Sequence, residues 1–429
     1  MKRPECSKEG MNMEKIVIKG GFPLSGNITI GGAKNSAVAL IPAALLSDGI
    51  CTIKNVPNIT DRDALFDIVK LLNCDIEQNG SEIRIDSTNL KNVLISQELS
   101  VKLRASYYFM GVLLGKYKHV EMYFPGGCNI GTRPIDLHLK GFKALGAKVT
   151  KYRHKYIISA DELKGADITL DFASVGATIN IMFAATRAKG ITTIKNAAKE
   201  VEIINIADFL NKMGAKISGA GSDIITIEGV DTLNGADIDV IPDRIEAGTY
   251  ILMGALLGNN LTIEGIIPEH NKALFDKLEE MGVDFKLEGK KVTINACNNL
   301  KPVSVTTLVY PGFPTDLGQP MSVLLTQANG TCKMEETIWE NRVGHYPYLS
   351  KMGANIELNG LVATINGKTK LYGTEINATD LRGGAALIVA GLIAEGTTTI
   401  YDIDYILRGY ENIINKLSNV GAKISLEKI

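Results

Sequence analysis

A loop around Cys128 carries the residue types in this chain best suited to chemistry. The segment 125–133 reads PGGCNIGTR, in which Cys128 stands among three glycines and Arg133 follows five residues later. Glycine permits backbone conformations closed to other residues and leaves room for a ligand. The planar guanidinium of arginine matches phosphate or carboxylate, and a cation near a thiol lowers its pKa and raises its reactivity. Taken alone, the loop fits either a reactive thiol beside an anion clamp or a small buried cysteine in an ordinary turn.

Size and charge limit the classes of protein to consider. The chain has 429 residues, of which 45% are hydrophobic and 22% charged, so it can bury the cores of two or three domains. Lys and Arg total 46 against 47 for Asp and Glu, and this balance argues against partners such as nucleic acid or a membrane surface.

The cysteines and the apolar runs predict a soluble, cytoplasmic protein. The six cysteines are scattered and form no CxxC pair, as is typical of proteins from a reducing compartment. Residues 1–14 lack the apolar stretch of a signal peptide, and the apolar run at 385–394 is too short to span a bilayer. No His/Cys/Asp cluster has metal-ligand spacing, and there is neither a GxGxxG nor a Walker loop. We therefore expect no metal and no cofactor.

One short motif recurs six times along the chain. An apolar residue followed by Gly-Ala-Lys and a β-branched residue occurs at 145–149, 213–217 and 420–424, with near copies at 281–285 and 352–356 and a degraded one at 72–76. Successive copies lie 68 to 73 residues apart. A second, Thr-rich motif falls between them, as in the segments 49–53, 190–194 and 396–400.

Each repeat predicts the same set of elements. The segment 36–46 is apolar on most faces and predicts a buried helix that ends at Asp48-Gly49. The Thr-rich segment after it favours a strand, 64–72 predicts an amphipathic helix, and a short strand pair follows. The repeat is too long for a solenoid, so we expect three units in each of two halves. The join is predicted near 240–243, and the strand 15–19 is expected to complete the second half.

The six βα units, the segment Gly31-Gly32-Ala33-Lys34-Asn35 and the Cys128 loop resemble the enolpyruvyl transferase family over about 16–424. The resemblance implies an α/β fold of two "inside-out" α/β barrel domains with three units each. One domain would comprise 1–33 plus 242–429 and carry Asp316, Arg382 and Arg408. The other, 34–241, would carry Lys34 and the Cys128 loop.

The resemblance also implies a reaction. The enolpyruvyl group of phosphoenolpyruvate would move to the 3′-hydroxyl of UDP-N-acetylglucosamine with release of phosphate, the first committed step of peptidoglycan synthesis. These two small molecules would be the partners, and no cofactor is implied. The sequence does not indicate the oligomeric state.

Lys34 and Asn35 open a predicted helix behind two glycines, where free N–H groups and the helix dipole favour an anion. The five residues alone fit a solvent-facing lysine better. The resemblance instead assigns both residues to the substrates and gives Lys34 and Arg408 catalytic roles.

Four arginines fit an anion clamp assembled from both halves as the domains close. A single arginine is usually a surface ion pair of small value. The resemblance assigns Arg133, Arg382 and Arg408 to the phosphate and carboxylate and implies that Asp380 also touches substrate. Arg104 would belong to the same cationic cleft.

The remaining roles follow from the resemblance as well. Cys128 would be the general acid that protonates the methylene carbon of phosphoenolpyruvate, and the thiol that fosfomycin-type epoxides alkylate. Asp316 would take the proton from the sugar hydroxyl, although an aspartate after Pro-Thr also suits a helix cap. Contacts to the nucleotide sugar would come from Arg133, Pro134, Ile135, Asp136, Leu137, Ser174, Val175, Gly176 and Ile338. His138 is expected in the core or behind the site.

Some positions depart from the family pattern. Leu407 replaces an aspartate, Val201 a proline, and Phe172 a polar or basic residue near the nucleotide, while Val343 and Gly344 replace bulkier residues. Two alternatives therefore stay open. One is a relative acting on shikimate 3-phosphate, against which the Cys128 loop counts; the other is a non-catalytic paralogue that binds the UDP-sugar.

Overall fold

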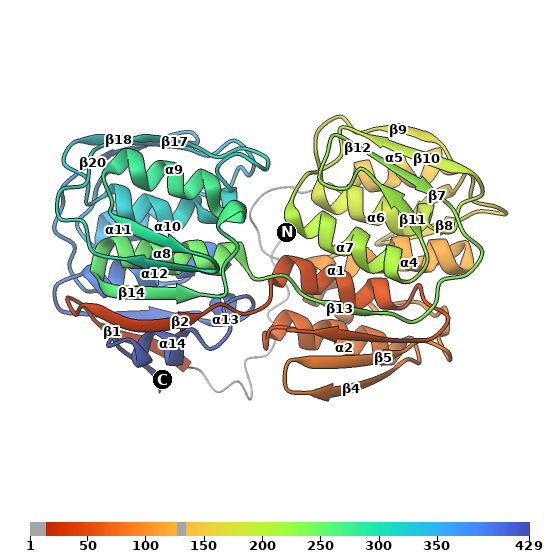
Figure 1. The fold of residues 1–429 in the computed structure, drawn as a ribbon, viewed down its shortest axis with the longest axis horizontal. Helices are drawn as coiled ribbons and strands as arrows, with labels where there is room; N and C mark the ends of the chain where they lie inside the picture. Colours follow the sequence, from red (N-terminus) through yellow and green to blue (C-terminus); the bar gives the residue numbers. More distant parts are fainter. Residues whose placement is uncertain (1–13, 127–133) are drawn as a thin grey trace.

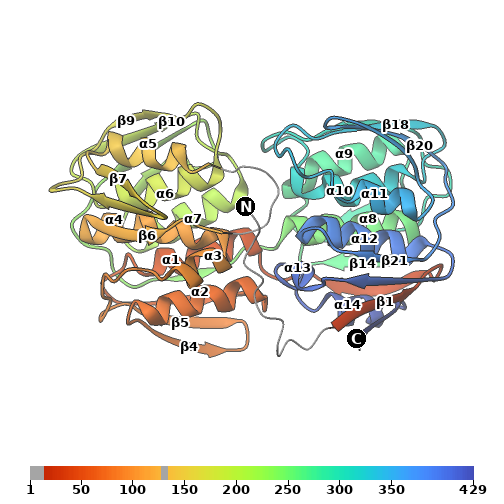
Figure 2. The ribbon, with the colours of Figure 1, turned by 180° about the vertical axis from the view of Figure 1, so that it is seen from behind.

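Two halves built on the same plan lie side by side in the computed structural model, which describes residues 14–126 and 134–429 (Figure 1). Over these residues the strands form six small sheets, five of four strands and one of three. In both halves helices fill the interior and the sheets lie outside, as the view from behind also shows (Figure 2). The predicted six-unit, inside-out α/β architecture is confirmed.

The half drawn from orange to light green is built around three apolar helices, α1 (Lys34–Ala44), α4 (Tyr108–Tyr117) and α6 (Val175–Ala185). Its other helices are α2 (Thr60–Leu71), α3 (Gln97–Lys102), η1 (Arg104–Tyr107), α5 (Asp136–Ala144) and α7 (Val201–Lys212). Its sheets have the orders β13-β3-β5-β4, β6-β8-β7 and β11-β12-β10-β9. The strands are β3 (Ile50–Lys54), β4 (Asp75–Asn79), β5 (Glu82–Asp86), β6 (His119–Tyr123), β7 (Lys148–Tyr152), β8 (Lys155–Ser159), β9 (Asp167–Thr169), β10 (Ile191–Lys195), β11 (Lys216–Ser218), β12 (Ile224–Glu228) and β13 (Asp237–Asp239).

The other half repeats the plan around α8 (Arg244–Leu257), α10 (Thr315–Leu325) and α12 (Leu381–Ile393). Its other helices are η2 (Pro268–Asn271), α9 (Lys272–Met281), α11 (Tyr346–Lys351), α13 (Asp404–Leu407) and α14 (Ile413–Asn419). Its sheets have the orders β15-β16-β14-β2, β17-β18-β20-β19 and β21-β22-β1-β23. The strands are β1 (Glu14–Lys19), β2 (Leu24–Thr29), β14 (Gly258–Glu264), β15 (Phe285–Glu288), β16 (Lys291–Ile294), β17 (Ser304–Thr306), β18 (Thr331–Glu335), β19 (Asn355–Asn359), β20 (Val362–Asn366), β21 (Glu375–Asn377), β22 (Thr397–Tyr401) and β23 (Lys423–Lys428).

The composition of the central helices explains the inverted layering. In α1 every residue from Ser36 to Ala44 is buried, and in α12 every residue from Leu381 to Leu392 is buried. A helix without a polar face cannot lie on the surface, so each is enclosed by the others and by the sheets. The helix predicted at 36–46 is confirmed with slightly earlier bounds.

The chain crosses between the halves in two neighbouring segments. Strand β1 lies between β22 and β23, and β2 pairs with β14, so the N-terminal strands complete the far half as predicted. The crossings at 31–33 and 241–243 run antiparallel, with a bridge between Gly32 and Pro242. A Cβ at Gly32 would collide with the Asn55 carbonyl, so only glycine fits there.

Two separate hydrophobic cores lie on either side of these crossings. One contains buried residues from Ala33 to Val240, and the other joins residues 16–30 to residues 245–424. We propose that these cores mark the two domains expected from the sequence, 34–241 and 1–33 plus 242–429.

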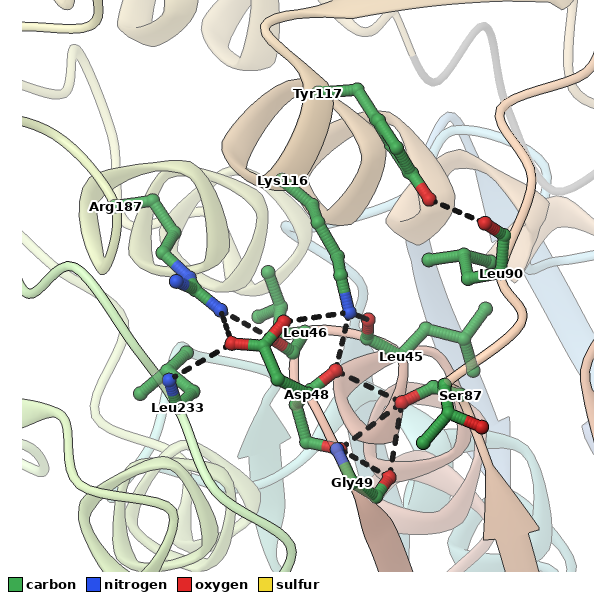
Figure 3. Close-up of polar contacts among 12 residues, drawn as sticks. Leu45, Leu46, Asp48, Gly49, Ser87, Leu90, Lys116, Tyr117, Arg187 and Leu233 are labelled. Atoms are coloured by element: carbon green, nitrogen blue, oxygen red, sulfur yellow. Dashed lines mark hydrogen bonds and ion pairs between the residues drawn. The ribbon is translucent and has the colours of Figure 1, made fainter.

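A polar cluster closes the carboxyl ends of the central helices in the first half (Figure 3). Lys116 at the end of α4 contacts Asp48 at 3.3 Å and donates to the Leu45 and Ser47 carbonyls. Arg187, just after α6, contacts Asp48 at 2.8 Å and donates to the Leu46 carbonyl. Cations placed at carboxyl-terminal ends satisfy orphan carbonyls and oppose the helix dipoles. This cluster belongs to the scaffold.

Candidate active site

Lys34 and Arg408 come from opposite halves and meet on one buried carboxylate, Asp61. Lys34 Nζ lies 2.8 Å from Asp61 Oδ2, and Arg408 Nε lies 2.7 Å from Asp61 Oδ1. Burial acts to raise the pKa of Asp61, but the two cations outweigh it and the pKa is lowered. The carboxylate is therefore ionised and holds both cations at the boundary between the halves.

The crossing segments fix where Lys34 begins α1. Ala33 offers no side-chain cap, so the Lys34 N–H donates to Asp243 Oδ2 at 2.9 Å. The other oxygen of Asp243 caps α8 by accepting from the N–H groups of Ile245 and Glu246. One aspartate therefore joins the starts of two central helices, one from each half. Asn35 follows Lys34 and is half-buried.

Asp316 lies in the first turn of α10 between two arginines. Arg342 Nη1 is 2.6 Å from Asp316 Oδ1, and Arg382 Nη2 is 2.9 Å from Asp316 Oδ2. Burial acts to raise the pKa of Asp316, yet the two guanidinium groups hold it far below its usual range. The carboxylate makes no helix cap, so that alternative from the sequence is not observed. In this arrangement Asp316 is a weak base.

Arg382 is held from several sides. Its backbone N–H donates to Asp380 Oδ1 at 3.0 Å, which caps α12, and its guanidinium lies 5.3 Å from the centre of the Tyr410 ring. The second oxygen of Asp380 accepts from Gln319 at 3.1 Å. Asp380 was expected at the substrate, but both of its carboxylate oxygens are engaged: one caps α12 and the other accepts a hydrogen bond from α10.

Arg104 lies at the base of the Cys128 loop. Its Nη1 donates to the Pro125 carbonyl at 3.4 Å, and its guanidinium lies 5.9 Å from the centre of the Tyr107 ring. The Gly126 N–H donates to the Ser100 carbonyl and so ties the start of the loop to α3. Cys128 and Arg133 themselves lie outside the described residues.

Two of the segments expected to contact the nucleotide sugar, 134–137 and 174–176, lie at the starts of neighbouring helices, and Ile338 lies in the loop after β18. Pro134 and Ile135 precede α5, and Asp136 and Leu137 begin it. Ser174 caps α6 by accepting the Ala177 N–H at 3.3 Å, and Val175 and Gly176 form its first turn. A Cβ at Gly176 would lie 2.7 Å from Tyr107 Oη, so glycine lets α6 approach η1.

His138 is a buried residue behind these segments. Its Nδ1 lies 2.9 Å from the Asn180 amide, and its ring packs edge-on against Tyr107. Burial, helped by the nearby Arg104, lowers the pKa of His138 to about 3, so the imidazole is neutral. A neutral, hydrogen-bonded ring in this place positions α5 against α6.

Sequence reasoning missed four residues that organise the site: Asp61, Asp243, Glu336 and Arg342. Asp61 and Asp243 stand at helix starts, where an acidic residue has an ordinary capping explanation. Glu336 precedes and Arg342 follows a short loop, 337–341, that carries no motif. Asp61 and Asp243 each bind a residue of the opposite half, whereas Glu336 and Arg342 bind residues at the start of α10 in their own unit. No local sequence signal marks either kind of contact.

The described cysteines differ from a reactive thiol. Cys51, Cys74 and Cys332 are buried, and burial raises the pKa of each, that of Cys74 to about 12. Cys297 is partly exposed and hydrogen-bonds the Gly282 carbonyl. Among residues 14–126 and 134–429, no three His, Cys, Asp or Glu side chains could hold a metal ion.

Known proteins resemble this chain along nearly its whole length. The family model for EPSP synthase (3-phosphoshikimate 1-carboxyvinyltransferase) matches residues 18–417. The UDP-N-acetylglucosamine 1-carboxyvinyltransferase of Clostridium botulinum is 50% identical over 414 residues, covering 96% of this chain and 99% of that protein. The protein of the same name from Halothermothrix orenii is 51% identical over 413 residues, with the same coverage.

Solved structures agree on the fold. The enolpyruvyl transferase NikO from Streptomyces tendae matches with a TM-score of 0.89 and 25% identity, covering 97% of this chain and 99% of that chain. The EPSP synthase of Acinetobacter baumannii matches with a TM-score of 0.74 at 18% identity, over 97% of this chain and all of that chain, and supports the fold alone. This chain therefore belongs to the enolpyruvyl transferase family.

Proposed function

We propose that this chain is a UDP-N-acetylglucosamine 1-carboxyvinyltransferase. It transfers the enolpyruvyl group of phosphoenolpyruvate to the 3′-hydroxyl of UDP-N-acetylglucosamine and releases phosphate, in the first committed step of peptidoglycan synthesis. The proposal rests on the sequence identity of 50% and 51% to two proteins of this name, each over 96% of this chain. The meeting of Lys34 and Arg408 from opposite halves adds a place where a small, highly charged anion can bind.

The proposed reaction is an addition followed by an elimination. The sugar 3′-oxygen bonds to C2 of phosphoenolpyruvate while the Cys128 thiol gives a proton to the methylene carbon. The tetrahedral adduct then loses phosphate while the Cys128 thiolate takes back a proton from the new methyl group, which restores the double bond and the thiol. Lys34, Arg382 and Arg408, with Arg104 and Arg133 beside them, hold the anionic groups and stabilise the charge on the departing phosphate.

Asp316 takes the proton from the sugar hydroxyl in this proposal. Its two arginines make it a weak base, so a change must precede the transfer. An anionic substrate group that draws Arg382 or Arg342 away from Asp316 removes one of the charges that lower its pKa. Substrate binding would thereby activate the base.

We place the reaction in the cytoplasm, where both substrates and the peptidoglycan precursors occur. The four described cysteines are unpaired, as suits a reducing compartment. None of the described helices is long and apolar enough to cross a membrane. Phosphoenolpyruvate and the nucleotide sugar are the proposed partners.

Phosphate release tests the proposal directly. The protein is incubated with phosphoenolpyruvate and either UDP-N-acetylglucosamine or shikimate 3-phosphate, with and without fosfomycin. Release that requires the UDP-sugar and is abolished by fosfomycin supports the proposal. Release with shikimate 3-phosphate alone assigns the other acceptor, and binding of the UDP-sugar without release supports the non-catalytic alternative.

A further inference from the structure

Glu336 divides the two oxygens of one buried carboxylate between two parts of the site. The residue follows β18, and 7% of it is exposed. Its Oε1 accepts the backbone N–H groups of Ile338 and Trp339 at 2.7 and 3.0 Å. Its Oε2 accepts the Thr315 hydroxyl at 2.7 Å. The first oxygen therefore fixes the loop that carries Ile338, and the second reaches the start of α10.

The hydrogen bonds continue from Thr315 to the candidate base. Arg342 Nη1 donates to Thr315 Oγ1 at 2.9 Å and lies 2.6 Å from Asp316 Oδ1. A single guanidinium nitrogen thus contacts both the hydroxyl and the carboxylate of adjacent residues. The path from the Ile338 loop to Asp316 runs through Glu336, Thr315 and Arg342.

The number of donors and acceptors on each group fixes the direction of every hydrogen bond along this path. A guanidinium only donates, so Thr315 must accept from Arg342 and direct its one hydrogen toward Glu336. Glu336 must then accept at both oxygens, since its other partners are backbone N–H groups. Glutamine would break this pattern, because an amide nitrogen facing Thr315 would donate to its second lone pair and leave the threonine hydrogen without an acceptor, while an amide nitrogen facing the loop would oppose the two N–H groups. The network requires a carboxylate at 336.

We propose that Glu336 is a positioning residue that holds the Ile338 loop and, through Thr315 and Arg342, the carboxylate of Asp316 as one unit. It links the loop assigned to the nucleotide sugar to the group that takes the proton from that sugar. The inference rests on the proposed function and adds to it the route by which sugar binding aligns the base.

The test is a double-mutant cycle on the full-length protein, with steady-state phosphate release as the readout. Glu336→Gln and Thr315→Val each lower kcat about 10- to 100-fold, and the double variant is no slower than the slower single variant, because all three interrupt one path. Thr315→Ser keeps the hydroxyl and retains kcat within about threefold of wild type. Glu335→Gln is the matched control, since the neighbouring Glu335 is exposed and its side chain accepts the Thr306 hydroxyl rather than that of Thr315.

A pH profile separates positioning from mere support of the fold. Loosening Arg342 removes a charge that lowers the pKa of Asp316, so the acidic limb of the kcat/KM profile moves to higher pH in Glu336→Gln and Thr315→Val. The proposal is overturned if the kcat losses of the two single variants multiply in the double variant. It is also overturned if Thr315→Ser is as slow as Thr315→Val. The same holds for a lower melting temperature with kcat and the pH profile unchanged.

Two outcomes keep this inference distinct from the proposed function. A wild-type protein that releases no phosphate with the UDP-sugar refutes the proposed function itself. An active wild type with kinetically normal variants refutes only the role of Glu336. If Glu336→Gln does not fold, the comparison of Thr315→Val with Thr315→Ser decides, since it removes one hydroxyl and leaves Glu336 in place.

Discussion

Arg408 contacts Asp61 at 2.7 Å although 347 positions of the sequence separate the two residues. The contact joins a turn after α13 in one half to the first turn of α2 in the other. Because Lys34 shares the same carboxylate, the position of Arg408 depends on the relation between the halves. Asp61 therefore couples the arrangement of the two halves to the positions of Lys34 and Arg408, the two candidate substrate-binding cations.

Replacing Asp61 by asparagine tests this dependence. Without the negative charge, Lys34 and Arg408 repel each other and leave their places, so we expect kcat/KM for phosphoenolpyruvate to fall about 10- to 100-fold. Asp63→Asn is the control, because that side chain is 58% exposed and pairs with its neighbour Arg62. Steady-state kinetics with each substrate varied will show the loss. Higher apparent affinity for phosphoenolpyruvate would mean that Asp61 competes with the substrate.

Removing Asp316 should affect turnover far more than binding. Asp316→Asn keeps the size of the side chain and cannot accept the sugar proton, so kcat should fall about 10²- to 10⁴-fold. Titration calorimetry with the UDP-sugar should give a dissociation constant within about threefold of wild type. A changed KM with normal kcat would remove Asp316 as the base. Thermal melting of the variant checks that Arg342 and Arg382 tolerate the lost charge.

Glu246 should make stability depend on pH in a range where few other acids titrate. It lies buried at the crossing, 2.6 Å from Lys416, and accepts the Gly31 N–H at 3.0 Å. Burial raises the pKa of Glu246 to about 7, although Lys416 acts in the opposite direction. A raised acid pKa means that the folded state holds the proton more tightly, so this contribution is present below pH 4.5 and is lost as the pH rises to 7.

The variant Glu246→Gln isolates this contribution. Relative to wild type, its free energy of unfolding should increase by roughly 2–3 kcal/mol between pH 5 and pH 8, because glutamine does not titrate. Urea denaturation at the two pH values measures the difference. His138 and His345 titrate in both proteins, so their effects cancel in the comparison. Parallel stability curves for the two proteins would contradict the assignment.

Lys116→Met should weaken the fold and spare the chemistry. The substitution leaves the Leu45 and Ser47 carbonyls without their donor and should lower the free energy of unfolding by about 1–3 kcal/mol. Since the cluster lies at the ends of α1, α4 and α6 opposite Lys34, kcat should stay within about twofold of wild type. Lys70→Met, at an exposed position in the last turn of α2, is the control. A large loss of kcat in the folded variant would tie this cluster to the active site.

Cys128 should be the thiol that reacts first. Iodoacetamide labelling followed by peptide mass spectrometry should find Cys128 modified at least about tenfold faster than Cys51, Cys74 and Cys332, whose pKa values burial raises. Cys128→Ser should retain UDP-sugar binding and lose most turnover. Equal labelling rates for all cysteines, or an active serine variant, would exclude an acid or nucleophile at 128.

The sequence predicted much of the fold because its signals are local and repeated. The Gly-Ala-Lys motif is exact in three units and altered in the other three, and the apolar helix at 36–46 has the same character as α6 and α12. The expected crossing of the N-terminal strand 15–19 into the far half is also observed, since β1 lies between β22 and β23.

The site was only partly predictable, for a physical reason. Lys34, Asp316, Arg382 and Arg408 were named in advance, and each lies in one of two charge clusters. Their partners Asp61 and Arg342 were not, because these contacts join separate helices and loops in three dimensions and leave no spacing signal in the sequence. Asp316 illustrates the difference: its place near the start of a helix after Pro-Thr could be read from the sequence, whereas its pairing with Arg342 and Arg382, which lowers its pKa against the effect of burial, could not.

The position of β1 between β22 and β23 has a consequence for the synthesis of this protein. The core from Ala33 to Val240 is contained in one continuous stretch of nascent chain, so it can form while the ribosome is still translating the rest. Strand β1 emerges first but finds both neighbours only about 400 residues later, roughly 20–80 s at ordinary elongation rates. Until then both of its edges are open to pairing with other chains, so we expect this strand to need protection while the chain is being translated.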